Sequence, residues 1–427
     1  MELKGKKLLI LGGIKLACDI VIRAKKMGVY VVVADYNTDS PAKKIADEAV
    51  LINAMDVDAI VEYCIKNKID GVTTGFIDIL LEPCLKVCNR LNLHCYLTPE
   101  MIEISTNKIK FKDTCNKYGV SVPQTYLVGN IISEEIYEKI NYPVFVKPLD
   151  SSGSRGAGVC YNREELDKQF NIAIGYSGSH NAIIEDYIVG REFLMNYIAQ
   201  DGEFRMISMF DRYSSSDRSA AINYANLSKG PSRAIDYYYN EVDEKVIGMF
   251  KSLGFKDGIY FIQGYSNGNR ITFFEMGCRL GGSYYDLEKK CVGIDPIDML
   301  IRYALTGKMT EEIYSIPYNI GKYNNIAVCI NYLLKGGDET IFSIEGIDEI
   351  KKMSSLVEYE QRQFVGEHYQ IDKIIDKPAL CVYLAVDNME QLINDVNYMN
   401  SIFHVKNEKG ESLLKEKFNP QLLKTLE

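Results

Sequence analysis

The chain has 427 residues, of which 47% are hydrophobic and 25% charged, as in an ordinary soluble globular protein of two to four domains. Its 58 acidic and 49 basic residues give a net charge of −9, which argues against a broad surface for nucleic acid or an anionic membrane. No apolar run reaches the roughly 18–20 residues of a membrane span. This composition excludes disordered, fibrous and disulfide-stapled proteins.

The first hundred residues alternate between expected strands and expected helices. Strands are predicted at 8–11, 29–34, 50–52, 71–74 and 93–96, and helices at 14–27, 57–67 and 78–91. Continuous apolar strands between helices predict a parallel sheet that is covered on both faces.

Two features of this region suggest a dinucleotide site. Gly12-Gly13 follows the first strand, and Asp35 ends the second, where a ribose-binding acid would lie. The segment LGGIKLACD lacks the GxGxxG fingerprint. A tight structural turn in a Rossmann-like domain is therefore favoured over dinucleotide binding.

The eleven cysteines are scattered along the chain without a CxxC pair. Cys84 and Cys88 lie four residues apart on an expected helix, and His94 is adjacent to Cys95. This pattern does not favour a zinc cluster. We interpret the cysteines as small, reduced core residues of a cytoplasmic protein.

A different pattern begins near residue 106. Helices are predicted at 108–117, 133–140 and 284–306, an extended segment at 120–128 and a strand at 143–147. Residues 182–276 are mostly alternating strand with a polar loop at 214–219, and short strands and helices are expected from 324 to 427. No repeat or low-complexity segment separates these parts.

The most informative stretch is PVFVKPLDSSGSRGAGVCYNREEL, residues 143–166. A strand ends at Lys147, and a loop rich in Gly and Ser leads to a second strand at 159–161. Asn162 and Glu165 then resemble a capping box that opens a helix. A Walker A loop would run directly into a helix, so we expect a hairpin flap that folds over phosphates, with Lys147 as a point charge. A flexible surface hairpin is the alternative.

Polar residues in apolar strands complete the set of candidates. AIIEDYIVGREF (182–193) offers backbone groups for adenine and Glu192 for ribose hydroxyls. ITFFEMGCRLGG (271–282) places Glu275 in an apolar strand, where a buried carboxylate needs a partner such as Mg²⁺. Gln263 lies on the preceding strand of the expected hairpin, and Arg279 follows Glu275.

The order of these motifs resembles the ATP-grasp superfamily of ATP-dependent carboxylate ligases over nearly the whole chain. The resemblance implies an α/β fold, α+β overall. A Rossmann-like domain at 1–105 would precede an ATP-grasp region at 106–310, with a small flap subdomain at about 120–187. A small α+β domain would follow at 311–427.

The resemblance also implies roles for individual residues. Those expected to be catalytic are Arg279, Lys147 and Arg155. Those expected to bind the nucleotide are Lys108, Lys147, Ser152, Gly153, Ser154, Gly156, Glu185, Asp186, Tyr187, Ile188, Glu192 and Phe274. Those expected to bind the metal are Gln263 and Glu275. Two positions depart from the family, since Gly277 replaces a usual Asn and Gln263 a usual acid.

RLGGSYYD, GIDPIDMLIRYALTGK and LLKGGDETIFSIEGIDEI are similar to the branch of carboxylate–amine ligases that includes L-amino acid ligases. The expected reaction uses ATP and Mg²⁺, with Mn²⁺ as a substitute, to join a small carboxylate to an amine through an acylphosphate. Purine- or carbamoyl phosphate-type phosphorylation and an idle nucleotide-binding protein are the alternatives. The resemblance leaves a homodimer open and does not name the two substrates.

Overall fold

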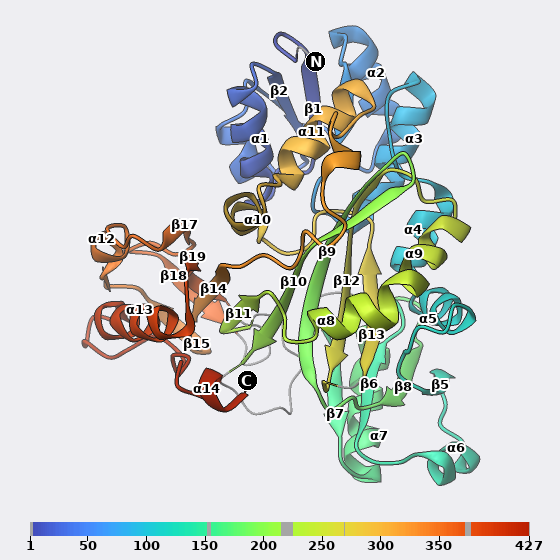
Figure 1. Ribbon diagram of the computed structural model, residues 1–427, viewed down its shortest axis with the longest axis vertical. Coiled ribbons are helices and arrows are strands. Elements are labelled where there is room, and N and C mark those ends of the chain that lie inside the picture. Colours follow the sequence, from blue (N-terminus) through green and yellow to red (C-terminus); the bar gives the residue numbers. More distant parts are fainter. Residues whose placement is uncertain (1–2, 152–154, 215–224, 269, 372–376, 427) are drawn as a thin grey trace.

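The computed structural model describes residues 3–151, 155–214, 225–268, 270–371 and 377–426 (Figure 1). It confirms the expected mixed α/β fold. An N-terminal unit lies at the top of the view, a long sheet runs down the centre, and a smaller sheet and the C-terminal elements lie below and to the side. Within the described residues, no helix is long and apolar enough to cross a bilayer.

The N-terminal unit is a four-stranded parallel sheet in the order β3-β2-β1-β4. Its strands are β1 (Lys7–Leu11), β2 (Tyr30–Ala34), β3 (Glu48–Val50) and β4 (Gly71–Thr73), and its helices are α1 (Ala17–Lys26), α2 (Val57–Asn67) and α3 (Leu81–Leu91). The parallel sheet was predicted by its apolar strands, three of which are almost fully buried. The strand expected at 93–96 is absent, because this segment pairs with no other strand among the described residues.

The glycine turn of this unit is closed by its own polar groups. The backbone N–H of Gly13 donates to Oδ2 of buried Asp35 at 2.6 Å, and the N–H of Asn37 donates to Oδ1 at 2.8 Å. Asp35 therefore holds the turn, as the structural interpretation of Gly12-Gly13 predicts.

The central element is an eight-stranded sheet in the order β13-β12-β9-β10-β11-β14-β19-β17. Its strands are β9 (Arg191–Gln200), β10 (Glu203–Tyr213), β11 (Leu227–Gly230), β12 (Gly258–Ser266), β13 (Ile271–Gly277), β14 (Ile326–Leu333), β17 (Leu356–Gln361) and β19 (Pro378–Val386). Every adjacent pair is antiparallel. The sheet therefore runs from the middle of the chain into its C-terminal part.

A separate antiparallel sheet in the order β5-β8-β6-β7 forms the lower part of the molecule (Figure 1). Its strands are β5 (Thr125–Gly129), β6 (Val144–Pro148), β7 (Gly158–Cys160) and β8 (Ala182–Asp186), with α6 (Glu134–Lys139) and α7 (Arg163–Gly175) packed on it. The predicted N-cap is present at α7, because the Asn162 side chain accepts from the N–H of Glu165 at 2.9 Å. Glu165 in turn accepts from the N–H of Tyr161, one residue before the cap, at 2.8 Å.

Two further predictions of local structure are wrong. Residues 235–252, expected among strands, form α8 (Ile235–Tyr237), a π-helical turn (Tyr238–Val242) and α9 (Asp243–Ser252). The single helix expected at 284–306 is two helices, α10 (Tyr285–Val292) and α11 (Pro296–Thr306). Gly293 ends α10 with φ +78°, and Asp295 caps α11 ahead of Pro296.

The remaining elements complete the connections. They are α4 (Pro99–Thr106), α5 (Lys108–Lys117), β15 (Gly337–Thr340), β16 (Ser343–Glu345), α12 (Ile347–Ile350), β18 (His368–Ile371), α13 (Met389–Ile402), β20 (His404–Lys406) and α14 (Leu422–Leu426). Near the top of the view, α11 crosses in front of the N-terminal unit (Figure 1), and it packs on α1 and β4. We propose domain boundaries near residues 105 and 310. Helix α11 then connects the first two domains.

Candidate active site

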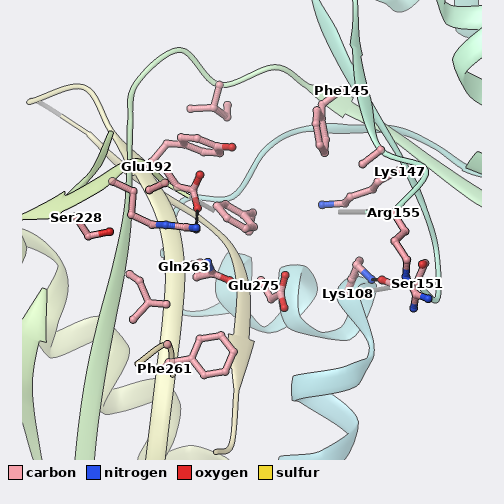
Figure 2. A pocket seen from close by; sticks show the side chains of 18 of the residues that line it. Lys108, Phe145, Lys147, Ser151, Arg155, Glu192, Ser228, Phe261, Gln263 and Glu275 are labelled. Atoms are coloured by element: carbon pink, nitrogen blue, oxygen red, sulfur yellow. Dashed lines mark hydrogen bonds and ion pairs between the residues drawn. The ribbon is translucent and has the colours of Figure 1, made fainter. Parts of the chain in front are cut away.

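A cavity of about 450 Å³ lies where the small sheet, the central sheet and the N-terminal unit meet. Figure 2 shows Lys108, Lys147 and Arg155 on one side of it, Glu192 on the opposite side, and Gln263 and Glu275 between them. The predicted residues that line this cavity are Lys108, Lys147, Arg155, Glu185, Asp186, Tyr187, Ile188, Glu192, Gln263, Phe274, Glu275 and Arg279.

The predicted flap is only partly described. Ser152, Gly153 and Ser154 lie outside the described residues. Gly156 has φ +73°, its carbonyl accepts from Nε2 of Gln169 at 2.9 Å, and a Cβ there would lie 2.8 Å from Tyr176. Gly156 thus packs against α7, whereas neighbouring Arg155 reaches the cavity wall.

Lys108 stands at the first turn of α5, where Asn107 caps the helix by accepting from two backbone N–H groups. Its Nζ donates to the carbonyls of Leu149 at 3.2 Å and Ser151 at 2.9 Å. Burial and the nearby charge of Lys147 lower the pKa of Lys108. Lys108 thus ties α5 to the start of the flap and brings a second positive charge close to Lys147.

A buried charge network surrounds Glu185, which is 2% exposed. Lys147 donates to its Oε1 at 2.6 Å, and Lys112 of α5 forms an ion pair with its Oε2. Burial favours the neutral acid, but the charges of Lys147 and Lys112 outweigh this and hold the pKa of Glu185 below its usual range. Lys112 was not predicted, because nothing in its sequence context distinguishes it from an exposed helical lysine.

Glu192, at the start of β9, is paired with Arg212 of β10. Both side chains are almost fully buried. Burial raises the pKa of Glu192 despite the adjacent guanidinium. The pair closes the side of the cavity opposite the lysines.

The segment from Asp186 to Ile188 connects the small sheet to the central sheet. The N–H of Asp186 donates to the Gln124 carbonyl at 2.9 Å, and its Oδ1 accepts from the hydroxyl of Tyr126 at 2.6 Å. Phe145, Tyr265 and Phe274 supply aromatic wall nearby, the last two with ring centroids 5.2 Å apart. This end of the cavity therefore offers flat apolar surfaces.

Gln263 and Glu275 are direct cross-strand partners on β12 and β13. Both are half-buried, and neither side chain forms a hydrogen bond or ion pair within the described part of the chain. Two adjacent oxygen donors on a cavity wall are a set that suits a hard cation such as Mg²⁺. The residues present therefore fit a metal ion at this position.

The structure explains why Gly277 departs from the family pattern. A Cβ at this position would lie 2.0 Å from the ring of Phe261, its cross-strand partner on β12. Phe261 thus occupies the space that a side chain at 277 would need. The ring also lies under the guanidinium of Arg279, with Cζ 4.8 Å from its centroid.

Arg279 is held by a residue from the N-terminal unit. Its Nε and Nη2 donate to the two carboxylate oxygens of Asp78 at 2.6 and 2.7 Å, and its Nη1 donates to the Leu280 carbonyl at 2.8 Å. Such a two-pronged contact fixes the plane of the guanidinium. Asp78 was missed because its partner lies 201 positions away in the sequence.

The far wall comes from the C-terminal part of the central sheet. Asn331 of β14 donates to the Ala225 carbonyl at 2.8 Å, and Arg362, just after β17, pairs with Glu360 at 2.7 Å. Both Asn331 and Arg362 line the cavity, as does Tyr284, whose hydroxyl donates to Ser228 Oγ at 2.9 Å. Sequence reasoning placed none of these residues at the site.

Comparison with known proteins agrees with this arrangement. Residues 107–312 match the family model described as carbamoyl-phosphate synthase L chain, ATP binding domain. A formate-dependent phosphoribosylglycinamide formyltransferase from Sulfurisphaera tokodaii is 27% identical over 298 residues, or 64% of this chain and 70% of the relative. Several other formyltransferases of this name are matched over about half of their length.

Solved structures resemble nearly the whole chain. The L-amino acid ligase from Bacillus licheniformis superimposes with a TM-score of 0.77 at 18% identity, covering 95% of this chain and 99% of the ligase. The biotin carboxylase domain of 2-oxoglutarate carboxylase from Hydrogenobacter thermophilus, a complex with MgADP and bicarbonate, gives 0.75 at 16% identity, covering 96% and 91%.

The matched domain, the shared fold and the order of the motifs all indicate an ATP-grasp protein. Enzymes of this superfamily use ATP with Mg²⁺, and this chain carries their ATP-binding domain. Residues 107–312 therefore match an ATP-binding domain of this superfamily, and the chain as a whole has the ATP-grasp fold.

Proposed function

We propose that the protein is an ATP-dependent carboxylate–amine ligase that forms an amide bond through an acylphosphate and releases ADP and phosphate. The observation that carries the proposal is that one cavity joins two lysines, an oxygen-donor pair and an oriented arginine. Phosphoryl transfer needs positioned charges more than a nucleophilic side chain. This set supplies such charges.

For the nucleotide, we assign the segment 186–188 to adenine and Glu192 to the ribose hydroxyls. Lys108 and Lys147 would hold phosphates, and Arg155 and residues 152–154 of the flap would cover them. Each ammonium group has three N–H donors, so Lys147 can keep its bond to Glu185 and still contact a phosphate oxygen. Gly156 is assigned to the flap through its positive φ.

Gln263 and Glu275 would hold Mg²⁺, which neutralises phosphate charge when bound. Arg279 would orient the carboxylate so that one oxygen attacks the γ-phosphate while the bond to the leaving ADP oxygen breaks. The amine then forms the C–N bond as the C–O bond to phosphate breaks, and the amine releases a proton. Exclusion of water by the flap would preserve the acylphosphate.

A second candidate shares this chemistry but uses formate as the acid and a phosphoribosyl amine as the acceptor. It is favoured by the 27% identity to the formyltransferase named above. The two candidates differ only in their substrates, because both form an acylphosphate and then a C–N bond.

The test is a screen of small acids and amines, with formate and amino acids as separate arms, for release of ADP and phosphate and for product mass. We expect turnover only when an acid and an amine are supplied together, and passage of ¹⁸O from the labelled carboxylate into phosphate. AMP and pyrophosphate would contradict the acylphosphate route, and ATP binding without turnover for any pair would indicate an idle binder.

Variants of two lysines on one helix sharpen the test. Lys108→Ala should weaken ATP binding by about tenfold, because it removes a charged contact worth about 1–2 kcal/mol. Lys110→Ala is the matched control, since Lys110 pairs with Glu103 outside the cavity. Equal affinities in the two variants would remove Lys108 from the phosphate site.

A further inference from the structure

Three cysteine side chains converge in the N-terminal unit, outside the machinery assigned above. The sulfur atoms of Cys84, Cys88 and Cys95 all lie within 4.8 Å of one another. Cys84 and Cys88 are 3% and 0% exposed, and Cys95 is half-buried. Spacing along the chain does not group Cys95 with the other two, so the cluster is visible only in the fold.

The local structure explains why the three sulfurs meet. Cys84 and Cys88 stand one turn apart on the face of α3 that covers β4, with sulfurs 3.9 and 4.0 Å from the Val72 carbonyl. Asn92 ends the helix in the left-handed conformation with φ 53°. The chain then turns back along α3, which brings Cys95 to the same two side chains.

The environment favours a thiolate at Cys95. Hydrogen bonds from the thiols of Cys84 and Cys88, and from the backbone N–H of Leu97, lower the pKa of Cys95 against the effect of burial. A thiolate is the form in which cysteine binds a metal.

The dimensions are compatible with Zn²⁺. Zn²⁺ binds thiolates at about 2.3 Å, so a tetrahedral site requires sulfur separations of roughly 3.8 Å, within reach of the observed arrangement. A second cavity of about 20 Å³ borders Cys84 and Cys95. A space of this size accepts one water molecule, which is the usual occupant of the fourth position when three protein ligands bind zinc.

We propose that Cys84, Cys88 and Cys95 bind one Zn²⁺ ion, with its fourth coordination position in the adjoining small cavity. Each thiol that becomes a thiolate releases its proton to solvent, so binding should weaken as the pH falls. The ion would hold the segment after α3 against that helix. This segment and Arg279 both line the small cavity.

The first experiment titrates the reduced, metal-free full chain with Zn²⁺ against a chromophoric chelator, and with Co²⁺ as a spectroscopic probe. We expect one ion per chain and a thiolate-to-cobalt charge-transfer band. Cys95→Ser should weaken Zn²⁺ binding by at least about 100-fold. Loss of a direct ligand should cost more affinity than loss of a residue that only forms a hydrogen bond to a ligand. Cys115→Ser is the control, because Cys115 is a buried cysteine whose core cluster contains neither Cys84 nor Cys88.

The second experiment requires no variant and so does not depend on its folding. X-ray absorption at the zinc edge of the loaded wild-type chain should show three sulfur neighbours at about 2.3 Å. Two or fewer sulfurs, no bound zinc, binding of Cu⁺ but not Zn²⁺, or unchanged affinity in folded Cys95→Ser would each overturn the zinc site.

Discussion

The N-terminal turn and the central cavity each place a carboxylate on or just after a strand, yet the two carboxylates are in opposite states. Asp35 accepts hydrogen bonds from two backbone N–H groups of its own unit. Glu275 faces the cavity and has no side-chain partner within the described residues. A carboxylate satisfied by its own backbone has little capacity left for a ligand, whereas Glu275 retains all of its capacity.

The largest effect should come from removing the charge of Glu275. Glu275→Gln should lower kcat by about 10²–10³, the loss expected when charge stabilisation of a transition state is removed. Asp35→Asn should keep turnover and cost about 1 kcal/mol of stability through a weakened hydrogen bond. The measurements are initial rates of ADP release and urea unfolding of both variants. Similar rates of ADP release in the two variants would contradict the different roles assigned to Glu275 and Asp35.

A third carboxyl group, that of Glu288, should make the stability of the protein depend on pH. Glu288 of α10 is 3% exposed, accepts from Asn196 Nδ2 at 2.7 Å and from Ser208, and burial raises its pKa to about 7. The folded state therefore binds its proton more tightly than the unfolded chain. Its contribution to stability is complete below about pH 4.5 and is lost as the pH rises through 7.

Wild type should lose stability as the pH rises from about 5 to about 8. The loss should be about 1–3 kcal/mol smaller in Glu288→Gln, which has no carboxyl group to titrate at this position. The measurement is urea unfolding at both pH values, with the exposed Glu349→Gln as the control. Parallel pH profiles of wild type and Glu288→Gln would mean that this buried carboxyl is not protonated at pH 5.

The fit of Phe261 over Gly277 gives the next prediction. Gly277→Asn should cost about 2 kcal/mol, because the new side chain overlaps the ring and overpacking has a cost of this order. Phe261→Ala/Gly277→Asn should recover part of this loss by vacating the space. Chemical denaturation of the two variants and of Phe261→Ala alone tests the coupling, and additive losses would contradict it.

The smallest effect concerns the contact between Asp78 and Arg279. Asp78→Ala should raise KM for the acid substrate by about tenfold and leave ATP affinity unchanged, because it frees the arginine without touching the nucleotide end. Glu82→Ala is the matched control, since Glu82 is exposed nearby and pairs with Lys86. A loss of ATP affinity in Asp78→Ala would move Arg279 to the nucleotide.

Local signals predicted much of the fold. The helices α2 and α5 were predicted with their observed bounds, and the structure shows that Asp56 and Asn107 cap them. Asn162 and Glu165 likewise marked the start of α7. Each of these signals acts within four residues of the helix start, so one sequence is enough to read it. Apolar strands similarly predicted the parallel sheet.

What failed depended on distant contacts or on competing signals. Residues 235–252 alternate enough to suggest a strand, but their apolar side chains pack as helices on the central core. Lys112 and Asp78 were missed because their partners come from other elements. Motif order grouped most cavity residues, but it could not indicate which charges are already paired.

The continuous eight-stranded sheet has a mechanical consequence. Since β11 pairs with β14 and β14 with β19, the C-terminal wall can move relative to β9–β13 only by breaking ladder hydrogen bonds. The small sheet shares no ladder with the large one in the described residues; residues 187–190 connect it to β9 of the large sheet, and residues 118–124 connect it to α5. Opening should therefore be a rotation of the small sheet about those connectors, and a base bound at Tyr187 and Ile188 would lie on the pivot.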